Sequence, residues 1–295
     1  MSRALVLGGG GPVGIAWEAG LLAGLAEQGV DLGQADFILG TSAGSVVGAL
    51  IAMGRDPRDI ARSIIAEADR PREIPQEVAQ ERSGAPNMMI LFQKMQEAAS
   101  GERDPQEVRR EIGEFSLSAQ TVEEESFLSG FGRQLAQAGD GTWPGHGYAC
   151  TAVDTASGEF VVWNADSRVS LSRAVASSCS VPGVFPAITL DGRRYMDGGM
   201  RSATNADLAK GHDLTVILAL RLGGGELSER MMRPLEREMQ ALADAGGRTE
   251  LILPGDARTA AFGMNLMNPR NRPAAAQAGL EQGRALAASL GVLWS

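Results

Sequence analysis

The sequence predicts an α/β protein with a mostly parallel central sheet, and two observations support this fold class. Over the first fifty residues, short apolar runs alternate with longer helical patterns, and the joints between them are short. Strand and helix in alternation build a parallel sheet, because each right-handed crossover helix returns the chain to the end of the sheet at which the previous strand began. A charged, helix-patterned stretch at about 55–145 then interrupts the alternation before strand patterns return. We therefore expect a single domain over 1–295 with a helical insertion at about 55–145.

The first two strand–helix pairs follow from local pattern. The apolar run 4–7 ends in four glycines and is typical of a buried parallel strand. A helical pattern covers 14–28, and Gly29 stands where a helix-ending glycine is expected. The second pair is a strand at 36–39 and a helix at 43–53.

The insertion is dense in charge, and prolines break its helical pattern at Pro71, Pro75, Pro86 and Pro105. Within it lies one apolar run, Met88-Met89-Ile90-Leu91-Phe92. Two interpretations are open at this point. The run belongs either to an ordinary solvated helical layer or to a lid that faces a lipid, for which the adaptable methionine side chain is suited.

Strand patterns return in the last half of the chain. Two strands at 148–153 and 160–163 are joined by a hairpin turn, and a short helix follows at 171–178. Asp191-Gly192 is a strong two-residue hairpin signal between strands at 187–190 and 193–196. The remaining elements are a strand at 214–220, an amphipathic helix at 226–245, a strand at 251–253 and a helix at 273–290.

Composition excludes several classes of function. The 44% hydrophobic content excludes a disordered or fibrous chain, and a net charge of −9 argues against a nucleic-acid partner. Two cysteines, Cys150 and Cys179, and two histidines are too few for a disulfide framework or the common metal sites, so we expect no metal and no cofactor. No apolar run is long enough for a membrane span or a signal peptide, so a cytoplasmic location is expected.

The strongest motif is Gly40-Thr41-Ser42-Ala43-Gly44, a Gly-x-Ser-x-Gly between a predicted strand and a predicted helix. A sharp turn at this place exposes the serine hydroxyl above the sheet, and the glycines on both sides avoid collisions with the neighbouring strand and helix. The helix that begins beside Ser42 favours negative charge there, because its first amides have no intrahelical acceptor. The motif predicts a nucleophilic Ser42 between the elbow glycines Gly40 and Gly44.

A glycine loop over 8–14 joins the first strand to the first helix. Acyl transfer needs amide donors for an oxyanion, and Gly10 and Gly11 can supply them, whereas Pro12 has no N–H. The loop also satisfies the G-x-G-x-x-G pattern of dinucleotide sites. That pattern requires an acidic residue at the end of the next strand, where this chain has 40–42 instead. An oxyanion hole is therefore the preferred interpretation.

The third motif is Asp197-Gly198-Gly199, directly after the predicted strand at 193–196. A carboxylate followed by two glycines can point into a crevice without steric interference. By itself the triplet is equally typical of an ordinary Asp-Gly turn. Together with the two upstream motifs it predicts a functional carboxylate at Asp197.

The three motifs, in this order and spacing, resemble those of the patatin-like phospholipases, lipid acyl hydrolases that use a Ser–Asp dyad. The resemblance extends over 174–205 and includes Ala176-Ser177-Ser178, Pro182, Phe185-Pro186 and Asn205. It implies a three-layer α/β/α fold with Ser42 as nucleophile and Asp197 as its base. The chain departs from the family at Val13, where a basic residue usually precedes the last glycine of the loop. A weaker contact with the oxyanion or the head group is expected there.

Two histidines offer a triad as the alternative to a dyad. His212 precedes the strand at 214–220, and His146 precedes the strand at 148–153. Both should therefore lie near the N-terminal ends of their strands, whereas sites in parallel α/β sheets gather at the C-terminal ends. Neither histidine is expected to be catalytic.

We accordingly expect a serine lipid acyl hydrolase, of phospholipase A or lysophospholipase type, that cleaves carboxylic esters through an acyl-enzyme. Its partner is a lipid or acyl-ester substrate, reached through transient contact with a membrane surface. Two alternatives stay open. One is a soluble carboxylesterase or thioesterase for short acyl chains, and the other is an acyl-lipid binding protein without turnover.

Overall fold

The computed structural model describes residues 1–69, 85–100, 102–136, 141–145, 147–221, 226–255, 262 and 265–294. Its described strands form one eight-stranded sheet in the order β5-β6-β3-β2-β1-β7-β8, with β4 paired to β3. The strands are β1 (Arg3–Leu7), β2 (Phe37–Gly40), β3 (Tyr148–Asp154), β4 (Phe160–Trp163), β5 (Ile188–Leu190), β6 (Arg193–Asp197), β7 (Leu214–Leu218) and β8 (Arg248–Ile252). Strands β8, β7, β1, β2 and β3 pair in parallel, and the pairings of β4, β5 and β6 are antiparallel.

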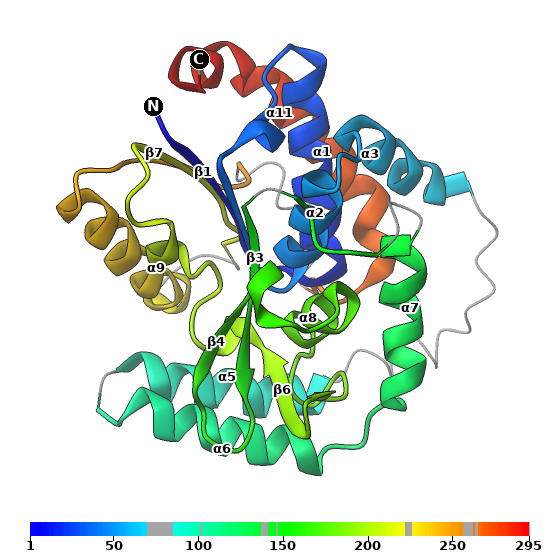
Figure 1. The fold of residues 1–295 in the computed structure, drawn as a ribbon, viewed down its shortest axis with the longest axis vertical. Coiled ribbons are helices and arrows are strands. Elements are labelled where there is room, and N and C mark those ends of the chain that lie inside the picture. The colour runs from blue at the N-terminus through cyan, green and yellow to red at the C-terminus, as the bar shows by residue number, and fades with distance from the viewer. Residues whose placement is uncertain are drawn as a thin grey trace.

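Helices cover both faces of the parallel part of the sheet (Figure 1). One face carries α1 (Gly11–Glu27), α2 (Ala43–Ala52), α8 (Leu171–Ser178) and α11 (Arg272–Trp294), and the other carries α9 (Glu226–Asp244). Strand β1 shows the division, because Leu5 and Leu7 belong to the core beneath α1, and Ala4 and Val6 belong to the core beneath α9. The predicted three-layer α/β/α fold is confirmed.

Two element boundaries differ from the sequence-based expectation for physical reasons. Helix α1 begins at Gly11 rather than at residue 14, because Pro12 fits the first turn of a helix although the apolar pattern starts later. Strand β8 begins at Arg248 rather than at residue 251. It is an edge strand with only its last residue buried, so its first residues carry no apolar signal.

The expected insertion contributes helices to both sides of the fold. Helix α3 (Pro57–Ile65) packs Ile60 and Ile64 into the core that also contains α1 and α11. Helices α5 (Ala85–Ser100) and α6 (Pro105–Ser118) lie together near β6, and α7 (Glu124–Ala136) lies against α8 (Figure 1).

The apolar run at 88–92 lies in α5 and is divided between core and solvent. Leu91 is buried in a cluster with Met196 and Met200, on either side of the Asp-Gly-Gly turn. Met89 and Ile90 are exposed, and the side chains of Met88 and Phe92 lie outside the described residues. One residue of the run is therefore core packing, and the lid interpretation rests on the exposed pair.

Helices α1 and α11 approach each other to backbone contact. Each carries two glycines one turn apart, and a Cβ on any of them would overlap backbone atoms of the other helix; they are Gly20, Gly24, Gly279 and Gly283. The close packing holds α1, whose first turn follows the glycine loop. Within the described ranges, no helix has the length and apolarity to cross a bilayer.

Candidate active site

Strand β3 brings two distant strands end to end. Gly40 at the end of β2 is paired with Cys150, and Asp197 at the end of β6 is paired with Ala152. Strand β4 pairs with the residues 150–153 of β3 and so occupies its opposite edge. Strands β2 and β6 therefore share one edge of β3 and run towards each other. Their C-terminal ends meet, and the elbow and the Asp-Gly-Gly turn become neighbours.

The backbone of Ser42 is strained in the manner that a nucleophile elbow requires. Its φ is 52° and its ψ is −116°, a conformation that costs about 1–3 kcal/mol for a non-glycine residue. A Cβ on Gly44 would overlap the carbonyl of Leu7, and a Cβ on Gly40 would overlap the backbone of Ser45. The two glycines thus let the turn lie flat against β1 and α2. Ser42 itself is 7% exposed.

The end of α8 and the two residues after it hold the backbone of both candidate residues. The Ser42 amide donates to Ser178 Oγ at 3.0 Å, and Cys179 Sγ donates to the Ser42 carbonyl at 3.1 Å. The Asp197 amide donates to the carbonyl of Ser180 at 3.0 Å. Sequence patterns placed a helix here but assigned these residues no role. Their signal was the run of four small polar residues at 177–180.

The Asp197 carboxyl is 2% exposed, and burial raises its pKa to about 7. The Ser42 hydroxyl and the Gly199 amide oppose this rise and lower the pKa. Oδ1 accepts from the Gly199 amide at 2.7 Å, whereas Oδ2 has no hydrogen-bond partner among the described residues. The Ser42 hydroxyl therefore lies near enough to lower the pKa of the carboxyl, although it donates no hydrogen bond to Oδ2. A carboxyl titrating near neutral pH can accept a proton and return it.

The glycine loop passes directly beside the elbow. The Gly8 carbonyl accepts from the Gly44 amide at 3.0 Å, and a Cβ on Gly9 would lie 3.5 Å from that of Ser42. The amides of Gly8 and Gly9 are occupied by the carbonyls of Leu218 and Ala203. Within the described part of the chain, the amides of Gly10 and Gly11 donate to no acceptor. These two residues directly follow Gly9, which lies against Ser42.

Two other side chains near the loop shape its electrostatics. Val13 is fully buried and its amide donates to the Leu266 carbonyl at 3.2 Å, so no basic group stands at this position. Glu18, five residues further along α1, is also buried, and its burial raises its pKa well above the ordinary value. Burial therefore disfavours a negative charge on Glu18, which would oppose an oxyanion at the loop.

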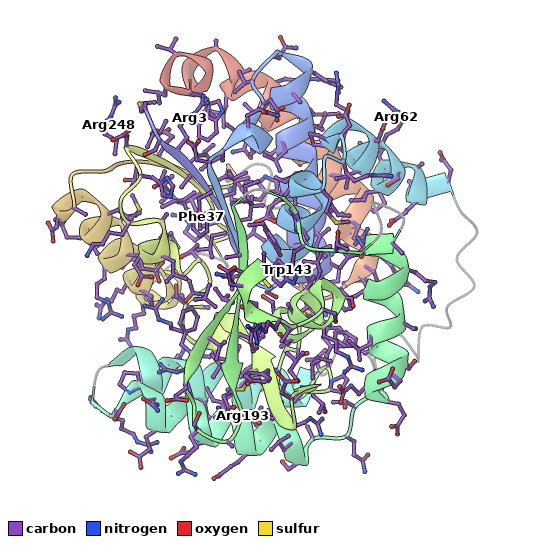
Figure 2. All side chains as sticks on the ribbon, in the orientation of Figure 1. Arg3, Phe37, Arg62, Trp143, Arg193 and Arg248 are labelled. Atoms are coloured by element: carbon purple, nitrogen blue, oxygen red, sulfur yellow. The ribbon has the colours of Figure 1, made fainter. Side chains whose placement is uncertain are left out.

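The structure separates His212 from the other candidates. Its ring stacks on Phe37 with centroids 5.6 Å apart, and Phe37 begins the strand that Ser42 follows (labelled in Figure 2). His212 is therefore at the opposite end of β2 from the elbow. His146 lies outside the described residues.

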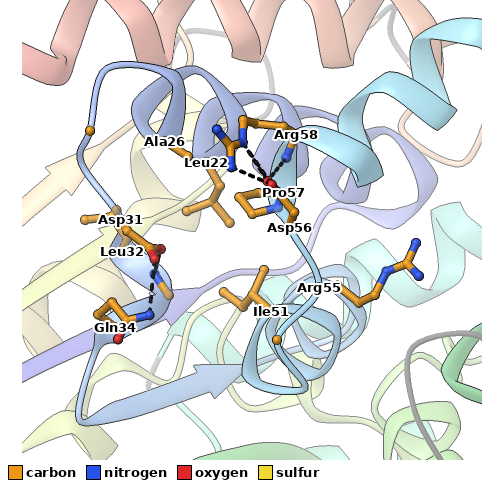
Figure 3. A pocket seen from close by; sticks show the side chains of 13 residues that line it. Leu22, Ala26, Asp31, Leu32, Gln34, Ile51, Arg55, Asp56, Pro57 and Arg58 are labelled. Carbon is orange, nitrogen blue, oxygen red and sulfur yellow. Dashed lines mark hydrogen bonds and ion pairs between the residues drawn. The ribbon is translucent and has the colours of Figure 1, made fainter.

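A cavity of about 320 Å³ lies between the C-terminal ends of α1 and α2 and the start of α3 (Figure 3). Both helices begin at the glycine loop and the elbow, so the cavity lies at the opposite end of the sheet from these two motifs. Its Asp56 pairs with Arg58 at 2.6 Å. In the described ranges, no group of three or more His, Cys, Asp or Glu side chains is placed to hold a metal ion.

Comparison with solved structures finds similar chains at low identity. VipD from Legionella pneumophila is 16% identical with a TM-score of 0.46, and the alignment covers 98% of this chain and 67% of VipD. The type III effector ExoU is 17% identical with a TM-score of 0.41, over 98% of this chain and 53% of ExoU. ExoU from Pseudomonas aeruginosa in complex with SpcU gives 18% identity and a TM-score of 0.37, over 96% and 52%. The chain thus spans about half the length of ExoU.

No curated protein matches the sequence. The family model of the patatin-like phospholipases matches residues 5–210, which contain the glycine loop, the elbow and the Asp-Gly-Gly turn. This match covers more than half of the chain. The chain belongs to the patatin-like phospholipase family of lipid hydrolases.

Proposed function

We propose that this protein is a serine lipid acyl hydrolase that cleaves carboxylic esters of lipids or phospholipids through a Ser42–Asp197 dyad. The observation that carries the proposal is the meeting of a strained serine with a buried carboxyl whose pKa is about 7 and whose Oδ2 has no partner. A general base works best when its pKa lies near the working pH, and burial gives Asp197 this property without a histidine.

The mechanism follows from the two side chains. Asp197 takes the hydroxyl proton of Ser42 as Oγ attacks the ester carbonyl, and the amides of Gly10 and Gly11 stabilise the resulting oxyanion. The tetrahedral intermediate collapses when the C–O bond to the alcohol breaks and Asp197 returns the proton to the leaving oxygen. Water, deprotonated by Asp197, then attacks the acyl-enzyme, and the fatty acid leaves with Ser42 restored.

The proposed substrate class follows from the family, whose model matches residues 5–210. The buried Val13 supplies no cation to the loop, so the two amides carry the charge of the oxyanion without help from that position. We propose lipid or acyl-ester substrates and transient contact with a membrane surface, without a metal or cofactor.

An alkyl fluorophosphonate probe tests the nucleophile directly. Its phosphorus forms a bond to the nucleophilic oxygen as fluoride leaves, so it reports serine reactivity independently of lipid preference. We expect stoichiometric labelling of the wild type, loss of labelling in Ser42→Ala, and a labelled peptide that contains Ser42. Labelling that persists in a folded Ser42→Ala variant would contradict the assignment.

Product analysis separates the three candidate activities. Mass spectrometry of fatty acids released from phospholipid, lysophospholipid and butyrate ester should show release from the long-chain lipids. Turnover confined to the butyrate or to acyl thioesters would support the short-chain esterase or thioesterase. A chain that binds lipid but is not labelled by the probe would be the binding protein.

A further inference from the structure

The segment Ser202–Asn205, which follows the Asp-Gly-Gly turn, contacts all three parts of the candidate site. The carbonyl of Ala203 accepts from the Gly9 amide at 2.7 Å and so holds the glycine loop. The carboxamide of Asn205 reaches the elbow at Thr41 and the turn at Gly198. No other described segment outside these parts is hydrogen-bonded to the loop, the elbow and the turn together.

The side chain of Asn205 is fully buried and its donors face the gap between the two strand ends. Nδ2 lies 2.8 Å from the Ser202 carbonyl, 3.1 Å from Thr41 Oγ1 and 3.3 Å from the Gly198 carbonyl. Thr41 precedes Ser42 and Gly198 follows Asp197. One amide group therefore bonds to a neighbour of the nucleophile and to a neighbour of the base.

Strand β3 contributes one more side chain, Thr151, to this hydrogen-bonded arrangement. Thr151 lies between Cys150 and Ala152, the pairing partners of Gly40 and Asp197. Its Oγ1 is 2.9 Å from Thr41 Oγ1 and 3.4 Å from Asn205 Nδ2. The hydroxyls and the amide form one buried polar cluster, in which each member limits the movement of the others.

Two acidic side chains and one arginine fix the orientation of Asn205. Arg201 donates to Asn205 Oδ1 at 2.9 Å and is paired with Asp207 at 2.7 Å, so the carboxamide oxygen faces the arginine and the nitrogen faces the site. Glu238 of α9 accepts from Thr204 Oγ1 at 2.6 Å and from the Ala206 amide at 2.8 Å, on both sides of Asn205. These contacts hold Asn205 in the left-handed region, at φ 51°.

From this geometry we propose that Asn205 is a positioning residue, which sets the distance between the Ser42 hydroxyl and the Asp197 carboxyl through Thr41 and Gly198. The proposal rests on the Ser42–Asp197 dyad proposed above. Displacement of reacting groups by about 1 Å can lower a rate about 10²-fold, so a single amide in this position can control turnover without contact with substrate.

The first test is Asn205→Asp, which keeps the shape and replaces the donating nitrogen by an oxygen that repels the Gly198 carbonyl. We expect kcat on a soluble butyrate ester and the rate of fluorophosphonate labelling to fall about 10²-fold, with KM within about twofold of wild type. The matched control is Asn164→Asp, at a helix cap where both residues serve equally well, and it should label at the wild-type rate. All assays are run well below the melting temperature of each variant.

The second test acts on the elbow side of the same contact and remains informative if Asn205→Asp does not fold. Thr41→Val removes the hydroxyl and should slow labelling at least about tenfold, whereas Thr41→Ser keeps the hydroxyl and should restore it. A merely structural role predicts that Thr41→Val and Thr41→Ser label at the same rate once both are folded.

The outcomes distinguish the two proposals. Labelling that is lost in Ser42→Ala but stays within about threefold of wild type in Asn205→Asp overturns the positioning role and leaves the dyad intact. Equal labelling of Thr41→Val and Thr41→Ser also overturns it. Labelling that persists in Ser42→Ala overturns the proposed function itself.

Discussion

Replacing Asp197 by Asn should abolish ester hydrolysis and, at alkaline pH, make the protein more stable than the wild type. The carboxamide keeps the shape of the side chain and cannot accept the Ser42 proton. The stability effect has a separate cause. Burial raises the pKa of Asp197 from the ordinary 3.8 to about 7, so the folded protein keeps a proton that the unfolded chain releases between these values.

The sign and size of the effect follow from this difference. Because the folded state holds more protons, stability falls as pH rises from about 4 through about 7 and then levels off. About three pKa units correspond to about 4 kcal/mol in total at 1.36 kcal/mol per unit. Between pH 5 and pH 8, the linked loss is about 2.5 kcal/mol, or roughly 5 °C in melting temperature for a chain of this size.

The assay is thermal unfolding by circular dichroism at pH 5, 6, 7 and 8, on wild type and Asp197→Asn in parallel. The gap between the two melting temperatures should widen in favour of the variant as pH rises. Asp166→Asn, at an exposed aspartate, is the control and should follow the wild type at every pH. The rate of Ser42 labelling in the wild type should rise through the same range, with a midpoint near pH 7.

Parallel melting curves for wild type and Asp197→Asn from pH 5 to pH 8 would refute this reasoning. They would mean that Asp197 is ionised in the folded protein at pH 5, and that burial does not control its titration. A labelling rate independent of pH over that range would contradict the assignment of Asp197 as the base.

The remaining predictions concern other parts of the molecule. His212→Ala should leave kcat on a butyrate ester within about twofold, because the imidazole lies at the far end of β2; a loss comparable to that of Asp197→Asn in a folded protein would require a triad. Gly20→Ala should lower the free energy of unfolding by several kcal/mol in denaturant titrations, because its Cβ overlaps the backbone of Ala276, and an unchanged midpoint would show that the helices can separate. Leu91→Ala should cost about 2–5 kcal/mol of stability. By contrast, Met89→Ser should leave the melting temperature unchanged and lower turnover of long-chain lipid more than of butyrate; equal losses on both substrates would exclude a lid.

Most of the fold was predictable because local sequence patterns identify its helices and strands. Apolar runs closed by glycines located β1 and β2, and the Asp191-Gly192 turn located the hairpin of β5 and β6. Strand β8 was placed too late because it is an edge strand with polar residues at its start. The antiparallel pairing of β6 on the edge that β2 also uses has no local signal, since it depends on pairings between residues more than 40 positions apart in β3 and β6 and 110 positions apart in β2 and β3.

Part of the candidate site was predictable from the sequence and part was not. Ser42, Asp197 and the glycine loop were predicted because each lies in a compact motif at a strand end. The residues that hold them were not assigned a role, because each acts through a contact across the fold. Glu238 is an example, although a signal existed. It lies on the same face of α9 as Leu235 and Leu242, and a carboxylate on an apolar face must find a partner when it is buried.

Because β2 and β6 meet end to end on one edge of β3, the three residues Cys150-Thr151-Ala152 fix the separation of the two strand ends along the sheet. The connections between α2 and β3 leave the sheet and return to it, so their lengths can change without altering the register of these three residues. Deleting one residue from the tripeptide would instead draw the strand ends about 3.3 Å closer and turn the side chains beyond it to the other face. Insertions and deletions should therefore be tolerated in the connections but not within these three consecutive residues of β3.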